Sequence, residues 1–134
     1  MTDTSSEVIA PHPPSGVVRV ALAGHHGAGH WASPFASCTH FMIYDVTQDS
    51  VNPVTKRPVS GGDRVSDKVV GRLALIRDSR ILVISAIGGP AAAQVTRAGI
   101  LPVKVDTEIS SVDWLENLRQ VLEKKPPPWL QMAL

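Results

Sequence analysis

Ile81-Leu82-Val83-Ile84-Ser85-Ala86-Ile87-Gly88-Gly89-Pro90 is the stretch on which the expected fold of this 134-residue chain depends. Its first part is β-branched and almost wholly apolar, which is typical of a strand covered on both faces. Two glycines and a proline follow directly, and proline is favoured in the first turn of a helix. The stretch therefore predicts a buried strand that turns at once into a helix, which continues over residues 91–98 and stops at Gly99.

Earlier in the chain, two further segments have the composition of strands. Val17–Ala23 is an almost continuous apolar run, and Thr39–Val46 has high β propensity. Because few residues separate them, we expect these two strands to pair. Residues 48–62 are rich in proline and glycine, so we expect mostly turn and loop there, with room for a short edge strand over 51–59.

The spacing of apolar residues changes after residue 62. From Asp63, a candidate N-cap, it predicts an amphipathic helix whose basic residues, Arg72 among them, lie off the apolar stripe. Pro102 predicts a break before a short strand over 103–105, and Ser110 with Asp113 resembles the capping box that begins a last helix. The expected buried positions are Val65, Val69, Val70, Leu73 and Ile76 in the first of these helices and Val112, Leu115, Leu118, Val121 and Leu122 in the last.

The expected order is a hairpin of two strands followed by alternating strands and helices, and this order favours an α/β fold. We expect a mixed sheet with helices on both faces. Residues 1–15 are proline-rich without hydrophobic periodicity, so they are expected to form a flexible leader before one domain over 16–134. With 43% hydrophobic residues, 19% charged residues and a net charge of +1, the chain suits a single globular domain. The polar N-terminus resembles no targeting signal, and the cytoplasm is the expected location.

Several classes of function do not fit the sequence. The motifs GxSxG, GxxxxGK[ST] and HExxH do not occur, and no apolar run approaches the roughly 18 residues of a membrane-spanning helix. Basic residues are scattered and aromatic residues make up 4%, which argues against a nucleic-acid surface. Gly27-x-Gly29-x-x-Ala32 matches a dinucleotide fingerprint only superficially, because Pro34 and the lack of a helical stripe exclude the helix that such a site needs.

Imidazole and thiol side chains gather around the loop after the first strand. His25, His26 and His30 lie within six residues, and Cys38 and His40 follow just beyond. These donors suit iron, zinc or copper. Two interpretations stay open for them, a metal-binding loop and a set of structural or solvated histidines, and a thiolate–imidazole pair for nucleophilic catalysis is a weaker third.

The turn at Gly88 and Gly89 is a separate candidate. A helix that begins directly after a strand presents backbone N–H groups and the positive end of its dipole at the carboxyl edge of the sheet, which favours an anion. The alternative is that these glycines only permit a tight turn. Arg97 and Lys104 flank the following turn and either add positive charge or are solvated surface residues.

Four blocks of the sequence resemble one known family. They are PFASCTHFMIYDV at 34–46, IGGPAAA at 87–93, RAGILPVKV at 97–105 and PPPWL at 126–130. Together they resemble the NifX/NafY family of dinitrogenase iron–molybdenum cofactor carriers. The resemblance implies a ribonuclease-H-like, three-layer α/β/α domain that binds the iron–molybdenum cofactor or its iron–sulfur precursor. It implies a carrier between scaffold proteins and apo-dinitrogenase, and not an enzyme.

One position departs from the family pattern. The family commonly has His-Phe-Gly-Ser-Cys before the second strand, with that histidine implicated in cofactor binding, whereas this chain has Pro34-Phe35-Ala36-Ser37-Cys38. Either a nearby imidazole replaces the absent histidine, or this chain binds a different cluster or none. The resemblance and the residue chemistry together predict a binding set of Cys38, His30, His26, His40, Gly88, Gly89 and Arg97, with Cys38 and His30 as metal ligands.

Two other functions stay open at this point. The first is a metal-independent interaction module that stabilises a nitrogenase assembly partner through the apolar tail of Trp129, Leu130 and Met132. The second is a simple transition-metal binder that takes up zinc or nickel through the histidine loop. Iron and molybdenum analysis after anaerobic reconstitution separates a cofactor carrier from both.

Overall fold

The computed structural model describes residues 16–25, 32–59, 65–106 and 110–124. Several predictions from the sequence fall outside these residues. They are the leader over 1–15, the helix cap at Asp63, the imidazoles of His26 and His30, and the apolar tail from residue 125 onward. No helix within the described residues is long and apolar enough to cross a membrane.

Five strands form one mixed sheet in the order β3-β2-β1-β4-β5. β2 pairs antiparallel with both β1 and β3, whereas β1 with β4 and β4 with β5 are parallel pairs. Within the described sheet, β2 is therefore the one strand that runs against the others, and the predicted α/β fold with a mixed sheet is confirmed. The strands are β1 (Val18–Gly24), β2 (His40–Val46), β3 (Val51–Pro58), β4 (Ile81–Ile84) and β5 (Leu101–Lys104).

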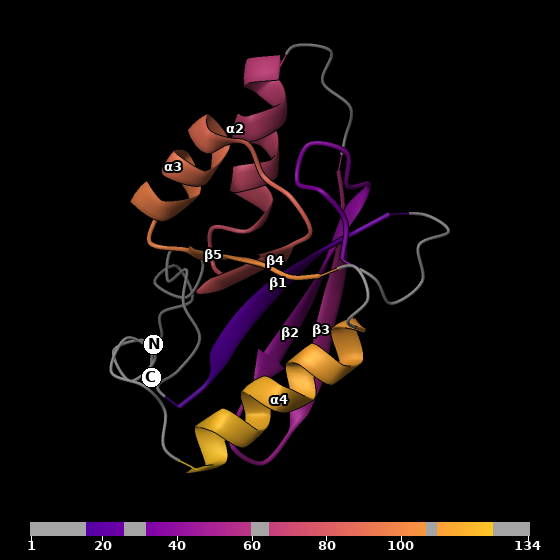
Figure 1. Cartoon of the computed structure of the whole chain (residues 1–134), viewed down its shortest axis with the longest axis vertical. Helices are drawn as coiled ribbons and strands as arrows, with labels where there is room; N and C mark the ends of the chain where they lie inside the picture. Colours follow the sequence, from indigo (N-terminus) through magenta and orange to yellow (C-terminus); the bar gives the residue numbers. More distant parts are fainter. Residues whose placement is uncertain (1–15, 26–31, 60–64, 107–109, 125–134) are drawn as a thin grey trace, which may run out of the picture.

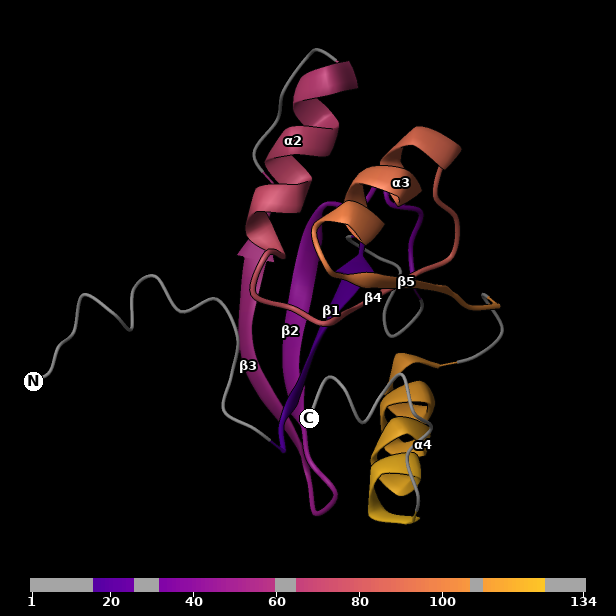
Figure 2. The same cartoon turned by 90° about the vertical axis from the view of Figure 1, so that its left-hand side faces the viewer.

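Helices cover both faces of the sheet (Figures 1 and 2). One face carries α2 (Val65–Leu75) and α3 (Gly89–Arg97), and the other carries α4 (Ser111–Lys124). Because side chains alternate along a strand, Ala21 and Ala23 of β1 pack under α2 and α3, while Val20 and Leu22 pack against α4. This alternation makes the three-layer arrangement that the sequence predicted.

Prolines at the two edges of the sheet explain two differences from expectation. Residues 51–58 form a full edge strand rather than mostly loop. Its two prolines, Pro53 and Pro58, are tolerated because β3 pairs with a neighbour on one side only. β5 includes Pro102, which the sequence placed at a break. The N–H groups of Leu101 and Val105 donate to the carbonyls of Arg80 and Ile84, so the alternate position Pro102 faces the open edge, where no donor is required.

The predicted helices form, with some changes in which side chains they bury. Ser110 caps α4, because the N–H of Val112 donates to its Oγ at 3.2 Å. In α2, Arg72 is buried at 7% exposure although the sequence placed it off the apolar stripe. It lies three residues after Val69 and four before Ile76, which is the spacing of the inward face. Three valines expected in the core are exposed instead, Val70 at 63%, Val112 at 53% and Val121 at 39%.

A network of ion pairs ties the end of α2 to three strands. Arg19 of β1 donates to both carboxylate oxygens of Asp45 at 2.7 and 2.9 Å and to Asp78 at 2.9 Å. Arg57 of β3 donates to both oxygens of Asp78 at 2.7 and 2.9 Å and to the carbonyl of Leu75, the last residue of α2, at 2.7 Å. The network therefore holds α2 in place against the sheet.

The charges in this network reinforce each other. Burial opposes ionisation of Asp78, but hydrogen bonds from Arg57 and Arg19 outweigh it and lower the pKa of that carboxyl below its ordinary value. The hydrogen bond with Asp45 raises the pKa of Arg19. Asp78 is therefore a carboxylate at any pH near neutral.

Candidate functional site

The loops that follow β1 and β4 meet at the carboxyl edge of the sheet. The N–H of Ser33 donates to the carbonyl of Ala23 at 3.0 Å, and the carbonyl of Ser33 accepts from Ser85 at 3.0 Å. The N–H of Phe35 donates to Ala86 at 2.9 Å. Residues 33–35 therefore lie between the ends of two parallel strands, and β4 stops at Ile84 rather than continuing to residue 87. This edge is where α/β folds generally bind ligands.

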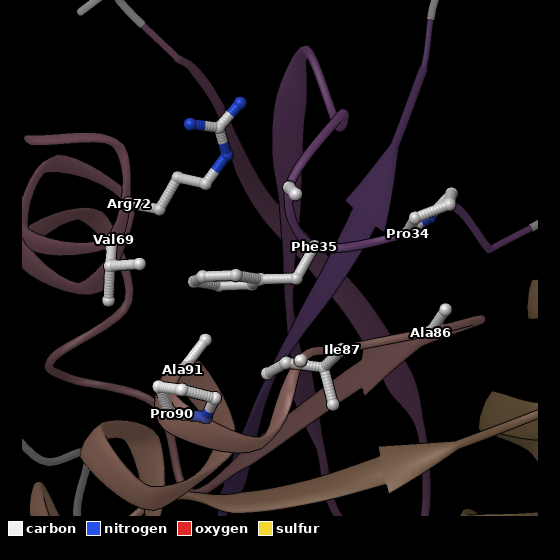
Figure 3. A pocket seen from close by; sticks show the side chains of 10 residues that line it. Pro34, Phe35, Val69, Arg72, Ala86, Ile87, Pro90 and Ala91 are labelled. Atoms are coloured by element: carbon white, nitrogen blue, oxygen red, sulfur yellow. The ribbon is translucent and has the colours of Figure 1, made fainter. Parts of the chain in front are cut away.

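A groove of about 500 Å³ opens beside these loops, between α2 and α3 (Figure 3). Phe35 lies at its centre, with Val69 of α2 on one side and Ile87 below. Apart from Arg72, every residue that lines the groove is apolar or glycine. The lining residues are Pro34, Phe35, Ala36, Val69, Arg72, Ala86, Ile87, Gly88, Pro90 and Ala91.

Arg72 brings a positive charge to the wall of the groove. It is the only charged residue among those that line the groove in the described part of the chain. Its Nη2 donates to the carbonyl of Cys38 at 3.1 Å, which joins α2 to the turn after Phe35. A guanidinium so withdrawn from water interacts with an anion more strongly than an exposed one.

The start of α3 borders the groove at Gly88. Gly88 is extended, with φ −72° and ψ 155°, and Pro90 occupies the first turn, as predicted. The N–H of Ala92 donates to the carbonyl of Gly88 at 2.9 Å, and no side chain caps this end of the helix. A Cβ placed on Gly88 or on Gly89 would meet no atom within 4 Å. Neither glycine is therefore required by crowding, and Gly89 is not among the lining residues.

Cys38 is turned into the core. Its side chain is 2% exposed and packs with the residues beneath α2 and α3, and its Sγ donates to the carbonyl of Phe35 at 3.2 Å. Burial raises the pKa of the Cys38 thiol, and the nearby Arg72 offsets this only in part. The thiol is therefore protonated at neutral pH, and ligation of a metal by Cys38 requires it to lose both this hydrogen bond and its proton.

His40 lies on the opposite face of the sheet from Cys38. It shares the side of β2 that carries Met42 and Tyr44, which pack toward α4. Its ring lies directly over the Cα of Gly24, its partner across the strand pair, and its Nδ1 is 3.1 Å from the Oγ1 of Thr39. The structure thus does not bring Cys38 and His40 together.

The remaining predicted residues divide between two places. Arg97 is exposed in the last turn of α3, at the far end of the helix from Gly89, and does not line the groove. Lys104 lines a second hollow of about 420 Å³ with Ser85, Val105 and Asp106. Among the described residues, no three His, Cys, Asp or Glu side chains are grouped so as to hold a metal ion. His30 and His26 lie outside that part of the chain, and their predicted roles are untested.

Two wall residues of the groove, Arg72 and Val69, were not predicted as site residues. The signal that identifies Arg72 is its position on the inward stripe of α2, together with its long aliphatic stem, which tolerates burial. Nothing in the sequence indicates that α2 and α3 stand apart over Phe35, because that gap depends on contacts distant in the chain.

The sequence and the fold of this chain are both similar to those of known proteins. The sequence profile described as dinitrogenase iron–molybdenum cofactor matches residues 16–121. The chain is 34% identical over 117 residues to protein NifY of Azotobacter vinelandii, which covers 87% of this chain and 48% of NifY. It is also 34% identical over 132 residues to protein NifX of Sinorhizobium fredii, which covers 90% of this chain and 79% of NifX.

The chain therefore spans about half the length of that NifY, at 48%, and most of that NifX, at 79%. The crystal structure of PH0822 superposes with a TM-score of 0.61 and 20% identity, over 76% of this chain and 90% of that chain. At this level of identity the likeness shows a shared fold alone.

Proposed function

Because this chain belongs to the dinitrogenase iron–molybdenum cofactor family, we propose that it acts in nitrogenase cofactor maturation by holding the iron–molybdenum cofactor, or its iron–sulfur precursor, as cargo. Its partners in this role are a cofactor scaffold protein and apo-dinitrogenase. The family profile over residues 16–121 carries the proposal, since that span includes every residue that lines the groove.

The cargo is an anionic metal cluster, and we propose that it binds at the carboxyl edge of the sheet beside the groove. Arg72 and the uncapped start of α3 supply positive potential there. The apolar walls formed by Phe35 and Ile87 limit the access of water. Direct metal ligands are proposed from the sequence, namely Cys38 and His30, with His26 as the alternative to His30. His40 is set aside, because it lies on the face of the sheet opposite Cys38.

A role as carrier rather than catalyst agrees with this arrangement. Release to a second protein requires that few protein groups bind the cluster directly, so that a competing site can displace them. A protonated, hydrogen-bonded thiol at Cys38 contributes to this, because it ligates only after the turn at residues 35–37 opens. We propose that this opening accompanies loading.

Anaerobic reconstitution with isolated iron–molybdenum cofactor tests the proposal. The wild-type chain is expected to retain iron and molybdenum in stoichiometric amounts after gel filtration. Gly88→Leu adds a side chain in open space at the groove and is expected to reduce the retained metal severalfold, whereas Gly71→Leu, an equally uncrowded and exposed position on α2, is the matched control. Absence of retained metal in the wild-type chain would refute a carrier role.

Separate substitutions at Cys38 and His30 then identify ligands. If Cys38→Ser and His30→Ala both keep full metal content, neither residue ligates the cluster and the proposed ligand pair is wrong. Visible absorption of the loaded variants reports a change in ligation even where the metal content is retained.

A second candidate function is a metal-independent interaction module that stabilises an assembly partner. The apolar lining of the groove and the burial of Cys38 favour it. In that case the chain binds purified apo-dinitrogenase with no iron or molybdenum present. Gly88→Leu then weakens the complex, as measured by sedimentation velocity, while Gly71→Leu leaves it intact.

A further inference from the structure

The edge strand β5 carries apolar side chains on the face of the sheet where α4 lies. Ile81 of β4 pairs with Leu101 of β5, and paired residues of neighbouring strands point to the same face. Because Ile81 and Val83 pack on the α4 side, Leu101, Val103 and Val105 lie on that side as well. Leu101 is nevertheless 40% exposed.

α4 covers only the other half of this face. It contacts β2 and β3, and Nη1 of Arg119 donates to the carbonyl of Gln48, in the turn between those two strands, at 3.0 Å. A helix about 10 Å wide covers two or three strands spaced about 4.8 Å apart, and not five. Among the described residues, no second helix lies on this side of the sheet (Figure 2). β5 therefore lies beside α4 rather than under it.

The flank of α4 that faces β5 is apolar. Residues seven apart share one side of a helix, so Trp114 and Val121 lie together, on the flank opposite Arg119. Since Arg119 reaches the turn between β2 and β3, the flank with Trp114 and Val121 faces β4 and β5. Val121 is 39% exposed. An apolar strip therefore runs along the sheet between the helix and the edge, formed by Trp114 and Val121 of α4 and by Leu101, Val103 and Val105 of β5.

The chain leaves α4 at the end of the sheet where this strip begins. β1 starts beside the turn between β2 and β3, because its first residue pairs with the last residue of β2. The parallel strands β4 and β5 start at that same end. α4 runs toward it, since Arg119 in the second half of the helix contacts that turn (Figure 1). Lys124, the last residue of α4, therefore lies at the end of the sheet where β5 starts with Leu101.

The residues that follow Lys124 have the length and the pattern to cover the strip. Their sequence over 125–134 is KPPPWLQMAL. Three prolines in an extended polyproline conformation span about 9 Å, close to the two strand spacings of about 10 Å that separate β1 from β5. Beyond the prolines, Leu130, Met132 and Leu134 fall at every second position, which is typical of an extended segment with one apolar face. Six extended residues reach about 20 Å, which exceeds the length of the four-residue strand β5.

We propose that residues 129–134 dock on the apolar strip of their own chain, with Leu130, Met132 and Leu134 turned toward Leu101 and Val103. The segment then completes the layer that α4 forms only in part. Docking withdraws these apolar side chains from contact with an assembly partner, a role that the sequence alone leaves open for the tail. It does not depend on whether the chain carries a metal cluster.

Urea unfolding of the full chain tests this docking. The variant with Leu130→Ser and Met132→Ser is expected to lower the urea midpoint by about 1 M, because two apolar side chains lose their buried environment. The matched control, Gln131→Ser with Ala133→Ser, changes the other face of the same segment and is expected to keep the wild-type midpoint. An unchanged midpoint for the first variant overturns the inference.

A double-mutant cycle identifies the surface on which the segment docks. Leu101→Ser, at a half-exposed position, and the pair Leu130→Ser with Met132→Ser are expected to overlap in effect, so that all three together lower the midpoint by less than the sum. Val70→Ser, at a position of α2 that is 63% exposed on the other side of the sheet, is expected to be additive with the same pair. Additive effects for Leu101→Ser, or equal overlap for Val70→Ser, overturn the inference.

Nuclear magnetic resonance of the wild-type chain gives a measurement that does not depend on how the variants fold. The chain has three methionines, and Met132→Leu identifies the methyl signal of Met132. Nuclear Overhauser effects from this methyl group to Leu101 or Val103 are expected. Their absence overturns the inference.

Two other occupants of the strip give different results. A tail that docks on a second copy makes the urea midpoint rise with protein concentration and produces a dimer in sedimentation velocity. A tail that serves a partner shows its contacts only after purified apo-dinitrogenase is added. Either result overturns the inference, whereas the same contacts in a monomer at every concentration support it.

Discussion

Replacement of Asp78 by asparagine is expected to destabilise the fold more than any other single change of one charged group in the described network. The Asp78 carboxylate accepts three hydrogen bonds, from Arg19 at 2.9 Å and from Arg57 at 2.7 and 2.9 Å. An asparagine side chain keeps the volume but presents an N–H₂ group to these donors and removes the negative charge between two guanidinium groups. The variant Asp78→Asn therefore leaves two arginines facing each other without their shared partner.

The size of the effect follows from burial. The side chains of Asp78 and Arg19 are each 20% exposed, and that of Arg57 is 27% exposed. Exposed ion pairs contribute about 0–1 kcal/mol, and loss of one partner from a fully buried pair costs about 3–5 kcal/mol. An intermediate loss of about 2–3 kcal/mol is expected, which lowers the melting temperature by roughly 8–12 °C in a domain of this size.

Urea unfolding at several pH values tests both the size and the cause. Since the folded pKa of Asp78 is lowered, the unfolded chain takes up the proton first on acidification. The stabilisation is present above the ordinary carboxyl pKa of about 4 and is lost as the pH falls through the folded value. The gap in unfolding free energy between wild type and Asp78→Asn should therefore narrow below about pH 4.

The exposed Asp49, in the turn between β2 and β3, provides the control. Asp49→Asn is expected to change stability by less than about 0.5 kcal/mol. A gap of under 1 kcal/mol at neutral pH, or one that stays constant between pH 3 and 7, would show that the charge of Asp78 does not hold α2 against the sheet.

Three further predictions concern Cys38 and two glycines. Burial raises the pKa of the Cys38 thiol, so iodoacetamide should modify the native protein far more slowly than the denatured protein, and equal rates would contradict this. The free energy of unfolding should also fall above about pH 8.5, because the unfolded chain loses the thiol proton first. Gly24→Ala places a Cβ where the His40 ring lies and should lower the free energy of unfolding by about 2 kcal/mol. Most of this loss should be recovered in the double variant with His40→Ala, and additive effects of the two substitutions would argue against the contact. Gly99 has φ +85°, so Gly99→Ala should lower the free energy of unfolding, measured in urea, by about 1 kcal/mol. The control Gly71→Ala in α2 should be neutral or stabilising. An unchanged urea midpoint for Gly99→Ala would contradict the need for glycine at this position.

Much of the fold follows from local patterns in the chain. β1, β4 and the start of α3 are predicted well because a strand covered on both faces needs an uninterrupted apolar run, and because glycine and proline mark where it ends. Gly99 is predicted for the same reason, since its positive φ is a property of one residue. The edge strands β3 and β5 are harder, because tolerance of proline depends on which side of a strand lacks a neighbour.

The candidate site follows from the sequence less completely. Its elements were identified at Gly88 and at residues 34–38, but the direction of each side chain was not. Cys38 faces the core because the turn that carries it is held at two points. The N–H of Phe35 donates to the carbonyl of Ala86, 51 residues further along the chain, and Arg72 of α2 donates to the carbonyl of Cys38. Contacts of such separation leave no trace in local spacing. The same reason explains why Cys38 and His40, two residues apart, lie on opposite faces.

Prolines at both margins of the sheet limit how another protein chain can bind to it. Pro53 and Pro58 on β3 and Pro102 on β5 interrupt the row of backbone donors that an incoming strand would need. We expect recruitment by strand addition, and fibril-like stacking of copies, to be suppressed at both margins. Complexes with other proteins then have to form through side chains of the helical layers or of the loops at the carboxyl edge. The five-stranded sheet gains no strand when such a complex forms.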